Sequence, residues 1–109
     1  MHAAAIDASE LLKALSNPQR LLIVCQLFEG ERSVGQIAKA LEIRDSTASQ
    51  HLAVLRKDGV VSARRDGHVV WYSVTSAPGR AVIETLYDVY CSTGRSNMKT
   101  GKAKSPRRR

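Results

Sequence analysis

The sequence is poor in cysteine and aromatic residues, and it contains no long apolar run. It has only two cysteines, Cys25 and Cys91, which excludes the disulfide framework of a small secreted protein. Apolar residues make up 43% of the chain, enough for one small core. No stretch approaches the roughly 18 apolar residues of a membrane span, and no basic segment followed by an apolar one opens the chain. We therefore expect a soluble, cytoplasmic protein without a membrane segment.

Acidic residues are missing from the C-terminal segment, which accounts for the whole net charge of +7. Residues 95–109 contain seven Lys and Arg, whereas the ten Lys and Arg of residues 1–94 are balanced by ten Asp and Glu. We divide the chain into a folded domain, residues 1–93, and a basic disordered tail, residues 94–109. The tail either keeps the protein in solution or adds salt-sensitive affinity for phosphates.

The most informative stretch begins at Asp45, a predicted helix cap, and ends at Gly59, a predicted helix stop. Ala48, Leu52 and Leu55 recur at helical spacing, which predicts a stripe facing the core. Short hydrogen-bonding side chains cover the opposite face and suit a helix lying in the DNA major groove. We predict that this face contacts DNA through Ser46, Thr47, Ser49, Gln50 and His51. For His51, local packing is the alternative.

The preceding stretch predicts a shorter helix over residues 34–41. Ser33 and Gln36 have the spacing of a capping box at its start. Residues 42–44 form a short turn into the helix that follows. Two short helices joined in this way are typical of a helix-turn-helix, in which the second helix reads the DNA.

A β-hairpin is predicted next, because Asp66-Gly67 separates two runs rich in β-branched residues, 60–65 and 68–74. Arg64 and Arg65 lie near its tip, where we expect them to contact DNA phosphates. Trp71 is expected to pack inward. A helix-turn-helix followed by a basic hairpin predicts a mainly α winged helix-turn-helix with about five helices and a two-stranded hairpin.

Three further helices complete the predicted domain, over residues 7–15, 18–28 and about 80–92. Asn17 is a predicted cap for the second of these, with Pro18 at its first position. That helix is apolar nearly all round and is expected at the centre of the fold, with Arg20 paired to an acid. The first and last helices are the predicted dimer seam, because the last has a broad apolar face of Val82, Ile83, Leu86, Tyr87, Val89 and Tyr90.

Three segments resemble the ArsR/SmtB family of bacterial repressors, and the resemblance covers roughly residues 8–92. They are Ala14–Leu22, which contains Ser-Asn-Pro-Gln-Arg, Ser49–Arg56, which begins Ser-Gln-His-Leu, and Gly59–Gly67. The resemblance implies a homodimer that binds an imperfect inverted repeat of double-stranded DNA and is released by an inducer. The usual metal-site patterns of the family, Cys-x-Cys near the third helix or Asp-x-His with further His on the last, do not occur here.

The two cysteines resemble those of the BigR/SqrR branch, with one midway along the second helix and one late in the last. This resemblance implies that reactive sulfur species are the inducer and that sulfane sulfur links Cys25 to Cys91. The residues themselves leave the matter open. Cys25 falls on an apolar stripe, where it can be a small core residue, and Cys91 lies at the border of the apolar and polar faces.

Three functions are therefore compatible with the sequence. The protein is a thiol-switched repressor, a metal-responsive repressor that uses Cys25, Cys91 and Asp88 with an outside ligand, or a DNA-binding protein without an inducer. We expect neither a cofactor nor a metal site within the chain. Paired carboxylates, a Ser-His-Asp arrangement and a Gly-rich phosphate loop are all missing, so we do not expect an enzyme.

Overall fold

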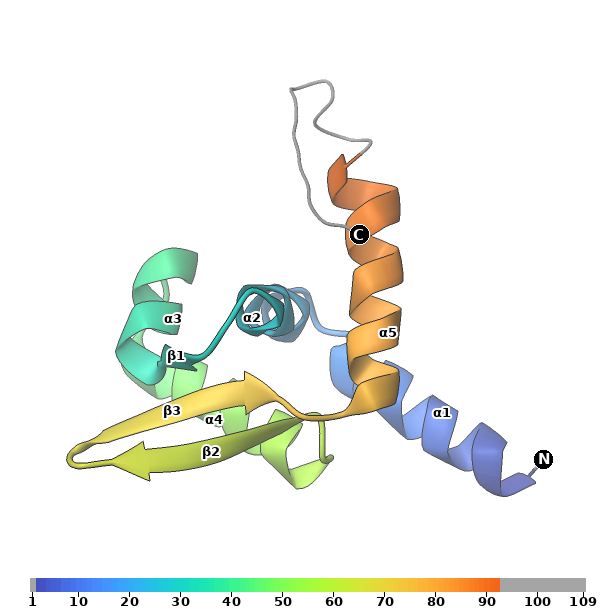
Figure 1. Cartoon of the computed structure of the whole chain (residues 1–109), viewed down its shortest axis with the longest axis horizontal. Coiled ribbons are helices and arrows are strands. Elements are labelled where there is room, and N and C mark those ends of the chain that lie inside the picture. Colours follow the sequence, from blue (N-terminus) through green and yellow to red (C-terminus); the bar gives the residue numbers. More distant parts are fainter. Residues whose placement is uncertain (1, 93–109) are drawn as a thin grey trace.

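The computed structural model describes residues 2–92, with side chains described as far as residue 90, and over this range it is a winged helix-turn-helix, as predicted (Figure 1). The predicted tail, 94–109, lies outside the described residues. The elements are, in order, α1 (His2–Leu15), α2 (Pro18–Phe28), β1 (Arg32–Ser33), α3 (Val34–Leu41), α4 (Asp45–Lys57), β2 (Val61–Asp66), β3 (Val69–Val74), α5 (Ala77–Leu86) and a π-helical turn, η1 (Tyr87–Ser92).

The central helix is α2, which packs against α1, α3, α4, α5 and β3. Its start follows the prediction: Asn17 Oδ1 accepts hydrogen bonds from the backbone N–H groups of Gln19 and Arg20, and Pro18 is the first helical residue. One side of this largely apolar helix remains uncovered, since Leu22 is 54% exposed. The buried side consists of Ile23, Val24 and Leu27.

The helix-turn-helix forms as predicted, with one correction at the start of α4. The N–H of Gln36 donates to Ser33 Oγ, and the N–H of Ser33 donates to Gln36 Oε1, which completes the capping box. Glu42 ends α3 in the left-handed region, at φ 59°. The cap of α4 is Arg44, without a side-chain cap bond, and not Asp45. Asp45 is the first helical residue, where its charge complements the helix dipole.

The end of α4 confirms the predicted stop at Gly59. The N–H of Gly59 donates to the carbonyl of Arg56 at 3.0 Å, and the N–H of Val60 donates to the carbonyl of Leu55 at 2.9 Å. These two bonds make a Schellman motif, which requires the positive φ of 77° at Gly59. The buried pair Leu55 and Val60 then directs the chain into β2.

The sheet has three antiparallel strands in the order β1-β3-β2, so the hairpin has a third strand that the sequence analysis did not predict. A two-residue strand is too short to show any alternation of apolar and polar residues. The hairpin turn also lies one residue later than predicted. Asp66 pairs with Val69, which leaves Gly67 and His68 in the turn, with Gly67 at φ 65°. Glycine at the first turn position is typical of a type II′ turn.

The two faces of the hairpin are set by the pairing of Val61 with Val74, both buried. Tyr72 lies on this face and packs against the core, whereas its neighbour Trp71 lies on the other face, opposite Arg64. The predicted inward position of Trp71 is therefore wrong. Adjacent strand residues point to opposite faces, so a shift of one residue in the strand pairing decides whether Trp71 or Tyr72 faces the core.

The first and last helices project from the end of the molecule opposite the hairpin tip (Figure 1). α1 begins earlier than predicted, at His2, and α5 begins at Ala77, where Ser76 Oγ caps the N–H of Gly79. Ile83 is fully buried in its own subunit, which removes it from the predicted dimer seam. Large apolar side chains are exposed at Ile6 and Leu12 on α1 and at Val89 and Tyr90 on η1. Between residues 2 and 92, no helix is long and apolar enough to cross a bilayer.

Candidate DNA-binding surface and thiol site

The outer face of α4 carries polar side chains that are open to a partner. Ser46, Ser49 and Gln50 are exposed, and Thr47 is half-buried. None of the four donates or accepts a side-chain hydrogen bond with another part of residues 2–92. The opposite stripe fixes the helix on the core, since it consists of the fully buried Ala48, Leu52 and Leu55. The helix therefore presents hydrogen-bonding groups outward from a rigid support, as contact with base edges requires.

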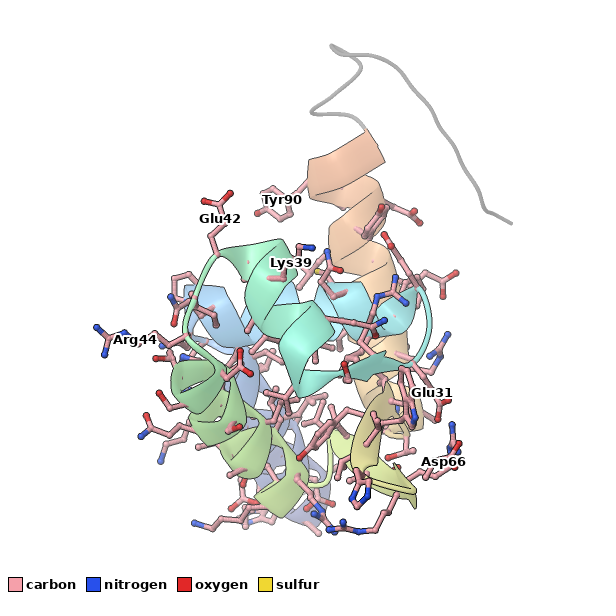
Figure 2. All side chains as sticks on the ribbon, turned by 90° about the vertical axis from the view of Figure 1, so that its left-hand side faces the viewer. Glu31, Lys39, Glu42, Arg44, Asp66 and Tyr90 are labelled. Carbon is pink, nitrogen blue, oxygen red and sulfur yellow. The ribbon has the colours of Figure 1, made fainter. Side chains whose placement is uncertain are left out.

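Arg44 places an exposed positive charge at the start of α4, and the sequence analysis did not include it among the DNA-binding residues. Its side chain extends outward from the start of α4, next to the exposed Asp45 (Figure 2). The sequence could have suggested this role, because Arg44 stands just before the predicted reading helix. It was assigned to the preceding turn because Asp45 was expected to be the cap.

His51 lies at the boundary between α4 and α2. Its Nε2 is 2.8 Å from Gln19 Oε1 and donates a hydrogen bond there in the tautomer that carries the proton on Nε2. Partial burial, and secondly the nearby Arg20 charge, hold the pKa of His51 below its ordinary value of 6.5. His51 is thus a half-buried group with a partner in its own chain, and its lowered pKa favours the neutral imidazole. The sequence around Gln19 contains nothing that predicts its contact with His51, which lies in a different helix.

Within residues 2–92, Arg20 has no acidic partner, contrary to the expectation from the sequence. Its Nε donates to the backbone carbonyl of Ala14 at 2.7 Å. Ala14 is in the last turn of α1, where the carbonyls have no partner within the helix. The bond therefore joins the end of α1 to the first turn of α2.

The first of the two predicted wing arginines is held by acidic residues. Arg64 donates from Nε to Glu31 Oε2 at 3.1 Å and from a terminal nitrogen to Glu31 Oε1 at 2.8 Å. Its other terminal nitrogen lies 3.9 Å from Asp66 Oδ2, and Figure 2 shows both acids on the same side of the molecule. The hydrogen bond from Arg64 holds the pKa of Glu31 below its usual value. The charge of Arg64 is therefore balanced within the protein.

The second wing arginine has a different environment. Arg65 lies opposite Val70, on the hairpin face that also carries Tyr72, and its side chain is exposed. It makes no ion pair with any residue that the structure describes. Of the two predicted phosphate contacts, Arg65 is the one whose charge is available to DNA.

Of the two cysteines of the predicted switch, the structure describes the side chain of Cys25 alone. Cys25 is half-buried on α2, beside the fully buried Val24. Cys91 lies in η1, and its side chain is outside the described residues. Phe28 and Tyr87 join the two elements by a ring contact, with centroids 6.3 Å apart, and the Arg80 guanidinium lies 4.8 Å from the centroid of Phe28.

This ring contact stands about one helical turn from each cysteine along the chain. Phe28 is three residues after Cys25, and Tyr87 is four residues before Cys91. The end of α2 and the start of η1 are thus packed together, about one helical turn along the chain from each cysteine. Among the residues described, no group of three or more His, Cys, Asp or Glu could hold a metal ion.

Comparison with known proteins identifies the domain. Residues 17–63 match the family of bacterial regulatory proteins described as the arsR family. The transcriptional activator HlyU of Vibrio cholerae is 43% identical over 91 residues, which are 84% of this chain and 84% of HlyU. The solved structure of reduced HlyU from Vibrio cholerae N16961 has a TM-score of 0.82 at 42% identity and covers 84% of this chain and 97% of that one.

Two other solved structures extend the comparison. The transcriptional repressor BigR from Xylella fastidiosa has a TM-score of 0.77 at 40% identity, over 84% of this chain and 94% of that one. The homodimeric winged helix-turn-helix domain of a possible ArsR-family regulator from Mycobacterium bovis has a TM-score of 0.75 at 29% identity, over 92% of this chain and 93% of that one.

Proposed function

Because the chain belongs to the arsR family of bacterial regulatory proteins, we propose that it is a homodimeric repressor acting on a near-palindromic operator. The observation that carries the proposal is the outer face of α4, where exposed hydrogen-bonding side chains stand opposite a fully buried stripe. In this proposal Ser46, Thr47, Ser49 and Gln50 contact the operator and Arg65 binds a phosphate. His51 and Arg64, also predicted from the sequence, already have Gln19 and Glu31 as partners.

The dimer in this proposal forms through α1 and the end of the last helix. Ile6 and Leu12 on α1, and Tyr90 on η1, are each more than half exposed in the single chain. The homodimeric relative from Mycobacterium bovis supports such an assembly. Two-fold symmetry then places the half-site centres about 34–36 Å apart, so that both reading helices enter the same side of the duplex. Sedimentation of a monomer at micromolar concentration contradicts the dimer.

The inducer in this proposal is sulfane sulfur, with Cys25 and Cys91 as the switch. Three observations support it: the packing of Phe28 on Tyr87 near both positions, the likeness to the repressor BigR, and a relative, HlyU, that is known in a reduced form. One thiolate attacks a polysulfide and displaces a shorter sulfide, which leaves a cysteine persulfide. The second thiolate displaces HS⁻ from the persulfide, so the two thiols lose two electrons and sulfane sulfur is reduced to sulfide. Where polysulfide has converted both cysteines to persulfides, the outer sulfur of one attacks the inner sulfur of the other and displaces HS⁻, which leaves a bridge of three sulfur atoms.

The bridge affects DNA binding through the dimer seam. It connects α2, at the centre of the core, to η1, which continues a helix of the proposed seam. A change in that seam alters the spacing of the two reading helices, so both can no longer engage successive grooves. Repression is lost only to the extent that the two forms differ in affinity, typically about 1–3 kcal/mol for a coupled switch.

The experiment measures operator affinity before polysulfide, after polysulfide and after dithiothreitol, with intact-mass spectrometry at each stage. We expect release by polysulfide, a mass change that identifies the bridge, and recovery with dithiothreitol. A direct disulfide loses the two thiol hydrogens, whereas a longer bridge also gains sulfur. Cys25→Ser and Cys91→Ser should bind the operator and ignore polysulfide, because one thiol cannot form a bridge within a subunit. Release of either single variant contradicts the bridge. A retained metal favours the metal-responsive function, and an unchanged mass with unchanged binding favours a protein without an inducer.

A further inference from the structure

The first turn of α2 holds two neighbouring side chains that bond to different helices. Arg20 donates to the carbonyl of Ala14 in α1, and Gln19 accepts from His51 in α4. The backbone N–H groups of both residues are in turn held by Asn17 Oδ1, at 2.9 and 3.1 Å. This turn is therefore a fixed junction between α1, on the proposed dimer seam, and α4, the proposed reading helix.

The remaining contacts of α4 with the core seat the helix by apolar packing, to which the hydrogen bond of His51 adds a directional restraint. They are made by Ala48, Leu52 and Leu55, and apolar packing is not directional. A hydrogen bond is directional and weakens steeply when its angle is lost. The bond of 2.8 Å between His51 and Gln19 lies at the edge of the apolar stripe, where it resists rotation of the helix.

His51 is also adjacent in the chain to Gln50, one of the exposed residues of the proposed reading face. Any rotation that strains the bond at His51 moves Gln50 relative to the base edges. A bidentate contact between a glutamine and an adenine tolerates little displacement. The bond is therefore placed where it can define how the reading face meets the groove.

We propose that Gln19 and His51 are positioning residues, which hold α4 in a fixed orientation relative to α1 and thereby match both reading helices of the dimer to the operator. The proposal rests on the proposed function, because it presupposes a dimer that reads DNA through α4. In this proposal His51 lies on the side of α4 that faces the protein and has Gln19 as its partner. The two residues then contribute to operator specificity although neither touches a base.

The test is a double-mutant cycle of Gln19→Ala and His51→Ala in the reduced, full-length protein. Operator and non-specific DNA affinities are measured over a series of salt concentrations. Loss of one hydrogen bond corresponds to about a twofold to tenfold change, so each single variant should lose operator affinity by about that factor. The double variant should lose no more than either single variant. Non-specific affinity and the salt slope should not change, because no phosphate contact is removed.

A matched control is Gln26→Ala, which makes the same change on the same helix at a side chain without a hydrogen bond in residues 2–92, and which should bind the operator as the unaltered protein does. Gln19→Glu keeps the acceptor oxygen, so operator binding should be retained and NMR titration should show the pKa of His51 raised by the carboxylate. Because glutamate keeps the size of the side chain and its acceptor oxygen, we expect the Gln19→Glu variant to fold and to report the contact even where the alanine variants unfold.

Three results overturn the proposal. They are an unchanged operator affinity in Gln19→Ala, an additive loss in the double variant, which makes His51 an independent DNA contact, and an unmoved His51 pKa in Gln19→Glu. Failure of the proposed function gives a different result, since the unaltered protein then shows no preference for any inverted repeat. The two failures are therefore distinguishable.

Discussion

The reading helix and the wing are both predicted to meet DNA, yet their polar residues are in different states. On α4, Ser46, Ser49 and Gln50 are exposed and make no side-chain bonds within the described range. On the hairpin, Arg64 is bound by the two carboxylate oxygens of Glu31, which lies 33 residues earlier in the chain. The comparison shows that residue type alone does not make a side chain ready to bind DNA. The side chain must also be without a hydrogen-bond or ion-pair partner elsewhere in the fold.

The largest expected effect tests the buried side of the reading helix. Leu52→Ala removes a fully buried side chain and leaves a cavity, so we expect the free energy of unfolding to fall by about 2–5 kcal/mol. The measurement is denaturant unfolding monitored by circular dichroism. Val54→Ala, on the same helix but 38% exposed, is the control and should cost much less. Equal losses in the two variants would mean that α4 is not seated as described.

The exposed side of the same helix should affect recognition and leave stability unchanged. Gln50→Ala should lower discrimination between the operator and single-base-pair variants by about 1–3 kcal/mol if Gln50 reads a base pair. Affinities for a panel of operator variants give this number, and the affinity of Gln50→Ala for random DNA should stay constant. A uniform loss of affinity across the panel would mean that Gln50 contacts the DNA backbone and does not read a base.

The two wing arginines offer a direct comparison within one strand. Arg65→Ala should weaken all DNA alike and reduce the salt slope by about one unit. Arg64→Ala should change the slope less, because Glu31 already balances its charge. Glu31→Gln should then make the slope steeper, since it releases Arg64 for a phosphate. If Arg64→Ala and Arg65→Ala reduce the slope equally, the ion pair opens on DNA.

The smallest expected effect is a pH dependence at the junction of α2 and α4. The pKa of His51 is lower in the folded protein than the ordinary 6.5, so the unfolded chain takes up the proton more readily. Stability from this group is complete above pH 6.5 and falls as the pH drops through and below that value. His51→Gln should flatten the dependence in unfolding experiments between pH 5 and 8. Glu31→Gln is the control, because the lowered pKa of Glu31 acts only below 4.5. A dependence unchanged in His51→Gln would contradict the described environment of His51.

Elements whose signals are local could be predicted from the amino-acid sequence alone. The cap at Asn17, the capping box of Ser33 and Gln36, the stop at Gly59 and the buried stripe of α4 all follow from residues a few positions apart. The helical period also separated the polar face of α4 from its apolar face without any knowledge of what lies beneath. These interactions form within one or two turns, so spacing along the chain is enough to predict them.

The partners of individual side chains could not be predicted in this way, because they depend on how the elements pack. The strand register exchanged Trp71 for Tyr72 in the core, the packing of α5 buried Ile83, and Glu31 and Gln19 bound Arg64 and His51. Each outcome depends on contacts between separate elements, which no periodicity within one segment records. The physical reason is that a polar side chain takes the partner that folding brings within hydrogen-bond distance, and only the packed fold sets that distance.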